Sequence, residues 1–233
     1  MHSLWLCVLG ASQLCKAAPR PLIEQSVFTL HEQSFSPGNG GRSMPVSHYN
    51  ITFDNVKLDK KAKQKLDHLD PLEFIRYDIV NTSLAVEQDL LSPNDADCAV
   101  VGTNAIFTAA DRYGSPSRVE FDPDTAKLYN TSHFFDFKGM TFKPLGPAPR
   151  GIVAGVYAWM IQDGKALHVY SAFAVWGASG YLHPIVADFP EYWPEWGVDV
   201  NMIEISARDP QGKRPWPLCV GRIELMLKER QGE

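Results

Sequence analysis

The sequence predicts an all-β protein: a single antiparallel β-sandwich or jelly-roll-like domain with one short helix. Beyond Pro71, apolar and polar residues alternate with a period of two in a series of short segments. These segments are rich in β-branched and aromatic residues. Turn signals separate them about every 8 to 12 residues, which is the spacing typical of sandwiches. No internal repeat interrupts the pattern, so we expect one domain.

The N-terminal residues are expected to lie outside this domain. Residues 1–17 have the apolar run of a secretory signal peptide, too short to span a bilayer, with Cys15 and Ala17 at the positions that precede a cleavage site. The alternative is a buried first strand or helix. Residues 18–47 are polar and end in SPGNGGRSMP, which predicts a flexible arm. The β-sandwich domain then spans residues 48–233.

The first elements of the domain are predicted to be a strand and the helix. HYNITFDNV, residues 48–56, alternates like a strand. In LDKKAKQKLDHLDP, a short amphipathic helix ending before Pro71 is predicted. Its apolar stripe consists of Leu58, Ala62, Leu66 and Leu69.

The clearest strand pair is GIVAGVYAWMIQDGKALHVYSAFAVW, residues 151–176. Asp163-Gly164 is a two-residue hairpin turn of the kind that favours positive φ. Both faces of this hairpin are apolar, so we expect one face in a core and the other either buried or lining a cavity. A last hairpin is predicted to join residues 200–207 to residues 217–228.

Sequons and cysteines indicate the secretory pathway. N-glycosylation sequons begin at Asn50, Asn81 and Asn130. Two of the four cysteines lie in the predicted signal peptide, which leaves Cys98 and Cys219. In an oxidising compartment this pair predicts one disulfide, and two buried free thiols are the alternative. We therefore expect a secreted glycoprotein.

Charge and hydropathy narrow the classes of partner. The net charge is −5, and basic residues concentrate only in the short KLDKKAKQK stretch, so nucleic-acid binding is not expected. After the signal peptide no apolar run approaches the length of a membrane span, so a soluble mature protein is expected.

The common catalytic signatures are missing from the sequence. Ser179 in GASGY lacks the spacing of the nucleophile elbow, and no H-E-x-x-H, P-loop or dinucleotide fingerprint occurs. The seven histidines form no pair at i, i+2 or i+4. No metal site and no cofactor are therefore predicted.

Aromatic and ionisable residues gather in the second half of the chain, most densely in FPEYWPEWGVD, residues 189–199, whose prolines predict a stiff loop. His183 or Glu195 is the candidate catalytic proton donor, because a carboxyl beside an indole is desolvated and its pKa rises. The alternatives are a surface histidine, a solvated loop glutamate, and core positions for the aromatic residues on strands. The candidate walls of a small-molecule pocket are Tyr157, Trp159, Tyr192, Trp193 and Trp196.

The overall plan also resembles a class of fungal secreted β-sandwich proteins. The resemblance is carried by the signal peptide, the sequons, the cysteine pair between an early strand and the CVGRIEL strand, and FDFKGMTFKPL before a tryptophan-rich second half. Within that class the chain resembles, over roughly residues 48–228, the hetero-Diels–Alderases of tropolonic sesquiterpenoid biosynthesis. No catalytic motif accompanies the resemblance, so no family site residue is transferred.

The resemblance implies a pericyclase that joins a tropolone quinone methide, formed by loss of water, to humulene or a related terpene. Such an enzyme mainly holds two apolar partners in a reactive geometry and donates a proton to the departing hydroxyl. One alternative is a secreted carbohydrate-binding module with Trp193, Trp196 and Trp216 as an open platform. Another is an effector with no small ligand. Aromatic side chains that converge around an enclosed, mostly apolar cavity favour the pericyclase, whereas coplanar rings open to solvent favour the sugar binder.

Overall fold

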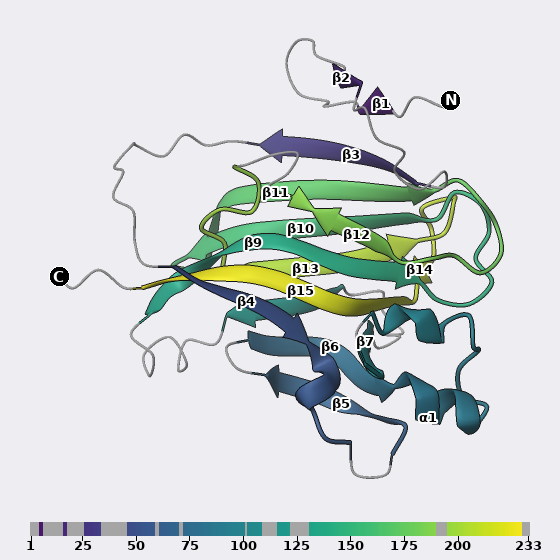
Figure 1. The fold of residues 1–233 in the computed structure, drawn as a ribbon. Coiled ribbons are helices and arrows are strands. Elements are labelled where there is room, and N and C mark those ends of the chain that lie inside the picture. The colour runs from purple at the N-terminus through teal and green to yellow at the C-terminus, as the bar shows by residue number, and fades with distance from the viewer. Residues whose placement is uncertain are drawn as a thin grey trace.

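In the computed structural model of the chain, one long antiparallel β-sheet curls over itself to form two facing layers (Figure 1). Every strand pair in the described part of the chain is antiparallel, which confirms the predicted fold class. The structure describes residues 5–6, 16–17, 26–33, 46–58, 61–69, 72–100, 102–108, 116–121, 131–189 and 195–229.

The strands of the large sheet fall into three groups. The first layer contains β4 (Val46–Thr52), β9 (Thr131–Pro144), β12 (Ile185–Asp188) and β15 (Leu218–Glu229). The second layer contains β3 (Ser26–Gln33), β10 (Val153–Gln162), β11 (Lys165–Trp176), β13 (Met202–Arg208) and β14 (Pro215–Trp216). The layers are connected through β5 (Lys63–Leu69), β6 (Leu72–Asn81), β7 (Asn104–Thr108) and β8 (Ser117–Phe121). A separate pair consists of β1 (Trp5–Leu6) and β2 (Lys16–Ala17).

A bend in β6 allows one sheet to supply both layers. Residues 72–75 of β6 pair with β8, whereas residues 77–81 pair with β7. Between them Arg76 has a φ of 66°, which is uncommon for a residue other than glycine. Ser117 Oγ donates a hydrogen bond of 2.9 Å to the Arg76 carbonyl oxygen. The strand therefore passes from one layer to the other at this residue, as strands do at the corners of folded sheets.

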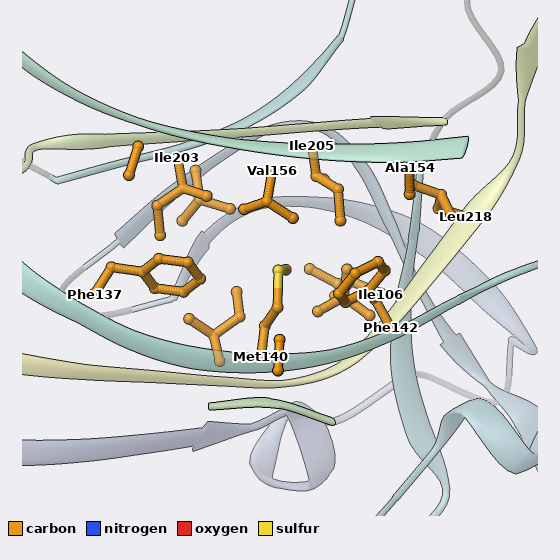
Figure 2. Packing of buried hydrophobic residues seen from close by; sticks show 14 of the residues in the cluster. Ile106, Phe137, Met140, Phe142, Ala154, Val156, Ile203, Ile205 and Leu218 are labelled. Carbon is orange, nitrogen blue, oxygen red and sulfur yellow. The ribbon is translucent and has the colours of Figure 1, made fainter. Parts of the chain in front are cut away.

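The main core lies between β9 on one side and β10 with β13 on the other (Figure 2). The β9 side chains that project into this core include the bulky Phe137, Met140 and Phe142. The side chains opposite them are the smaller Ala154, Val156, Ile203 and Ile205. The two layers thus interdigitate large residues with small ones, which is how dense cores are filled.

The helix predicted over LDKKAKQKLDHLDP is wrong, because residues 63–69 form β5. Leu66 of β5 is buried and pairs with Tyr77 of β6. Ala62 and Leu66 are four residues apart, a spacing that places them on one side of either a helix or a strand. Pairing with β6 decides between the two. The α-helix of the described residues is instead α1 (Thr82–Glu87), where Asn81 Oδ1 accepts the N-cap hydrogen bond from Leu84 N at 2.9 Å.

Two other segments also differ from the sequence prediction. The two strands of the predicted last hairpin do not pair with each other, since β13 pairs with β10, β8 and the short β14, whereas β15 pairs with β9, β7 and β4 in the other layer. Within the segment predicted as a flexible arm, the structure places β3, which pairs with β11 along eight residues. The hairpin of β10 and β11 forms as predicted, with positive φ at both Asp163 and Gly164.

The predicted disulfide is present. Cys98, at the end of the 3-10 helix η2 (Ala96–Cys98), is bonded to Cys219 of β15 with an S–S distance of 2.08 Å. Gly221 lies close by, and a Cβ on it would be only 2.1 Å from the Cys98 carbonyl oxygen. Glycine is therefore required where η2 approaches β15. A second 3-10 helix, η1 (Phe53–Asn55), follows β4.

A fully buried lysine anchors the same region. The Lys143 ammonium donates hydrogen bonds of 2.5 Å to the Asn94 carbonyl oxygen and to Asp97 Oδ1. Asp95 Oδ1 is 3.7 Å from the same nitrogen and also accepts from Gly146 N at 2.9 Å. A buried charge is tolerated when it is paired and hydrogen-bonded in this way. The segment before the disulfide is therefore fixed to β9 by charge as well as by the covalent bond.

We predict that Lys143→Met strongly destabilises the fold. The substitution leaves the buried Asp95 carboxylate and the Asn94 carbonyl without their cation, a change that costs about 3 kcal/mol. For a domain of this size the melting temperature should fall by roughly 6 °C or more. Lys165→Met, at an exposed position beside the β10–β11 turn, is the control and should melt near the wild-type temperature. Equal melting of the two variants would contradict the anchoring role.

Candidate functional site

The face of β10 that points away from the core carries large aromatic residues. Ala154, Val156 and Ala158 are buried and face the core. Tyr157 and Trp159 alternate with them and are half-buried on the opposite face. The hairpin is therefore apolar on both faces, as the sequence predicted, and its outer face holds the larger side chains.

Phe173 of β11 joins these two residues to form a group that we name the outer aromatic cluster (Tyr157, Trp159 and Phe173). The rings of Tyr157 and Phe173 are 5.6 Å apart and nearly perpendicular, at 88°. The Tyr157 and Trp159 rings are 6.4 Å apart and inclined at 33°. Phe173 therefore stands as a wall against Tyr157, and each of the three side chains stays partly accessible.

A row of polar residues meets the cluster at Tyr157. The strand register places Tyr157 between Ser171 of β11 and Glu204 of β13, and Glu204 is opposite Arg118 of β8. Residues opposite one another in antiparallel strands share a face. Glu204 Oε2 is 3.8 Å from Arg118 Nε, and the Glu204 side chain is only 19% exposed. The sheet thus sets one partly buried carboxyl beside Tyr157, at the edge of the cluster.

Burial changes the acidity of this group. Desolvation raises the pKa of the Glu204 carboxyl above its ordinary value, and the Arg118 charge opposes this rise. The pKa of the Tyr157 hydroxyl is also raised, first by burial and then by the nearby Glu204 charge, with Arg208 opposing. Tyr157 thus stays a neutral donor and acceptor at physiological pH. Glu204 keeps its proton to a higher pH than an exposed glutamate.

The cluster also contains a hydrogen-bond donor without an acceptor. Trp159 Nε1 is buried, and no described residue accepts its hydrogen. The core residues Trp176 and Trp196 have unpaired Nε1 donors too, so this feature does not by itself distinguish the cluster. The arrangement as a whole can hold a flat apolar molecule against aromatic faces and supply a proton from Glu204.

The predicted wall residues are not all brought together. Trp196 is buried, stacks on Phe189 at 3.9 Å with an interplanar angle of 16°, and lies against Phe137 and Tyr170. Those partners belong to the inter-layer core, so the sheet separates Trp196 from Tyr157 and Trp159. Tyr192 and Trp193 lie outside the described residues. The described part of FPEYWPEWGVD therefore serves to close the core.

The two predicted proton donors lie in exposed positions. Glu195 is exposed. His183 is 76% exposed, and its Nδ1 is 3.3 Å from Asp97 Oδ2, the carboxylate that also binds Lys143. No ring contact of the outer aromatic cluster involves either residue.

The asparagines of the three predicted sequons lie in different surroundings. Asn50 is exposed on β4. Asn81 caps α1, and its Nδ2 is 3.4 Å from Thr103 Oγ1. Asn130 lies outside the described residues.

Sequence reasoning missed Phe173, Glu204 and Arg118. Glu204 lies in the alternating stretch VNMIEISA, where a charged residue reads as an ordinary solvent-facing position. Only the register of β13 against β10 makes it a neighbour of Tyr157. The one available signal was the doubly apolar hairpin, which marked the outer face as unusual.

The described residues contain neither a group of side chains suited to a metal ion nor a helix suited to a membrane span. No three His, Cys, Asp or Glu residues there lie close enough to share a metal ion. No helix there is long and apolar enough to cross a bilayer.

Comparison with known proteins gives one distant structural similarity. No protein-family model matches the chain, and no curated protein matches its sequence. The crystal structure of a DUF4465 family protein from Bacteroides ovatus ATCC 8483 superposes with a TM-score of 0.44 at 12% sequence identity. The similarity covers 87% of this chain and 98% of that one.

We predict that Arg118→Gln raises the pKa of Glu204 further. The substitution removes the positive charge that favours the carboxylate, so the proton is held to a higher pH. Carboxyl chemical shifts followed by NMR through a pH titration measure the change. Arg222→Gln, whose partner Glu224 lies on β15 in the other layer, is the matched control and should leave the Glu204 titration unchanged. A lower pKa in Arg118→Gln would contradict the assigned pair.

Proposed function

We propose that the protein is a hetero-Diels–Alderase that couples a tropolone quinone methide to a humulene-type sesquiterpene at the outer aromatic cluster. The supporting observation is the partly buried Glu204 carboxyl opposite Tyr157, whose ring contacts those of Trp159 and Phe173. The identity of the two substrates comes from the family resemblance. The arrangement of this site supports the reaction type.

The proposed reaction has two steps. In the first, a hydroxymethyl tropolone loses water: the departing hydroxyl takes a proton from Glu204, and the ring hydroxyl returns a proton to the carboxylate. The product is a neutral quinone methide. In the second step its oxygen and methylene carbon add across one C=C bond of the terpene, forming one C–O and one C–C bond with no atom lost. Neither step consumes an oxidant or requires a nucleophile of the protein.

The site residues match what each step needs. A carboxyl with a raised pKa is a better proton donor near neutral pH than an ordinary glutamate, which suits the dehydration. The cycloaddition needs two apolar partners held in contact and in the correct orientation. Tyr157 and Phe173 offer two perpendicular aromatic surfaces for this purpose. The buried Trp159 Nε1 is a donor that a tropolone oxygen could accept from after a small movement of the ring.

The ring geometry favours this activity over the carbohydrate-binding alternative. A sugar platform needs exposed coplanar rings, whereas Phe173 stands perpendicular to Tyr157 and all three cluster side chains are half-buried. Trp196, one of the three residues expected in such a platform, is buried in the core. Trp216 is half-buried and donates its Nε1 hydrogen to the Leu145 carbonyl oxygen at 2.9 Å.

We also propose that the protein works in the secretory pathway or outside the cell. The disulfide is compatible with an oxidising compartment. Asn50 is exposed and suits glycan attachment, whereas Asn81 is engaged as a helix cap. A signal peptide over residues 1–17 would direct the chain there.

The test is a coupling assay with humulene and a hydroxymethyl tropolone, using protein made in a eukaryotic secretory host. Wild-type protein should give a single stereoisomer of the coupled product faster than the background reaction without protein. Glu204→Gln removes the proton donor and should slow coupling by about 100-fold or more. The measurement is the initial rate of product formation by mass spectrometry.

Glu120→Gln is the matched control, because Glu120 is a half-buried glutamate of β8 opposite Met202 and lies off the Glu204 row. The Glu120→Gln variant should catalyse the coupling reaction at close to the wild-type rate. A folded wild-type protein with no activity above background would overturn the proposed function. Equal rates for Glu204→Gln and wild type would remove Glu204 from the mechanism.

A further inference from the structure

We propose that Gly155 is the specificity-determining residue of the outer aromatic cluster, because the absent side chain lets the Tyr157 ring lie down against the sheet and present a flat surface. The inference rests on the proposed function for the location of the site. It assigns the site a ligand class, planar conjugated rings such as tropolone. No signal in the sequence singles out this glycine.

The space around Gly155 is filled by the cluster itself. Gly155 is buried on β10, opposite Phe173 of β11 and two residues before Tyr157 on the same face. A Cβ on Gly155 would lie 2.9 Å from Tyr157 Cε2 and 3.1 Å from Phe173 Cε1. It would also lie 3.2 Å from the Tyr157 hydroxyl oxygen. Cε2 and the hydroxyl group of Tyr157 therefore lie against the position that a side chain would otherwise occupy.

The reason for glycine here is space and not backbone conformation. Gly155 has none of the positive φ values found at the turn glycines. Alanine therefore fits the strand, and its methyl group acts only on the two rings. Glycine inside a strand weakens it and often marks a place where another group must approach closely.

A methyl group added at Gly155 must displace the Tyr157 ring, the Phe173 ring or both. A contact of 2.9 Å is too short for two carbon atoms, so the Tyr157 ring has to lift away from the sheet. The neighbours that limit its movement are Phe173 on one side and Trp159 on the other. A lifted Tyr157 narrows the space over the cluster, and a flat ring that lies on it loses contact area. Binding of planar rings should suffer most.

The test compares tropolone binding by isothermal titration calorimetry in wild type, Gly155→Ala and Val153→Ala. We expect Gly155→Ala to bind tropolone about tenfold more weakly, the effect of one misplaced methyl group in an apolar site. Val153→Ala changes the volume of the same outer face two residues earlier and should bind like wild type. In the coupling assay, Gly155→Ala should raise the KM for the tropolone more than it lowers kcat.

A second variant keeps the inference testable if Gly155→Ala folds poorly. Phe173→Leu gives the methyl group more room, so adding Gly155→Ala to that background should weaken binding less than it does in wild type. Equal tropolone binding by wild type and Gly155→Ala, or no binding by wild type, would overturn the inference. Tropolone binding that depends on Gly155, without any coupling activity, would support the inference and overturn the pericyclase proposal alone.

Discussion

The two-layered architecture depends on the bend of β6 at Arg76. The segment before it pairs with β8 in one layer and the segment after it pairs with β7 toward the other. Holding a non-glycine residue at a φ of 66° costs energy, and the Ser117 hydrogen bond to its carbonyl group helps to hold the bend. Because the sheet bends here, β9 can face β10 and β13, and a closed core forms between strands that never pair with one another.

The position of the aromatic cluster follows from how that core is filled. Phe137, Met140 and Phe142 project from β9 into the core between the layers. The β10 side chains that face this core, such as Ala154 and Ala158, are small. The large residues of β10 then lie on the other face, which reverses the usual distribution of large residues inside and small ones outside. The outer aromatic cluster is thus a by-product of core packing that is available for binding.

Local patterns in the sequence predicted local features well. The Asp163-Gly164 hairpin depends on residues adjacent in the chain, and the disulfide was the pairing expected for the two cysteines outside the predicted signal peptide, Cys98 and Cys219. The spacing of four residues between Ala62 and Leu66 fits one face of a helix and equally one face of a strand, and Leu66 was assigned to a helix. Only its pairing with Tyr77, which is distant in the sequence, shows that it belongs to a strand. Asn81 is a favoured N-cap residue and begins α1, but in the sequence it was interpreted only as part of a sequon. The site depends on register between distant strands, which no local pattern contains, so Glu204 and Phe173 were not found.

The central position of β15 has a consequence for how the chain folds. Its neighbours β4, β7 and β9 all precede it, and β4 is about 170 residues away in the sequence. During synthesis the first layer is therefore an incomplete sheet until β15 emerges, with the edges of β4 and β9 unpaired. Open strand edges are sites of association with other chains. A compartment with chaperones and oxidising enzymes would shield these edges, and the Cys98–Cys219 bond would mark the moment when the sheet is complete.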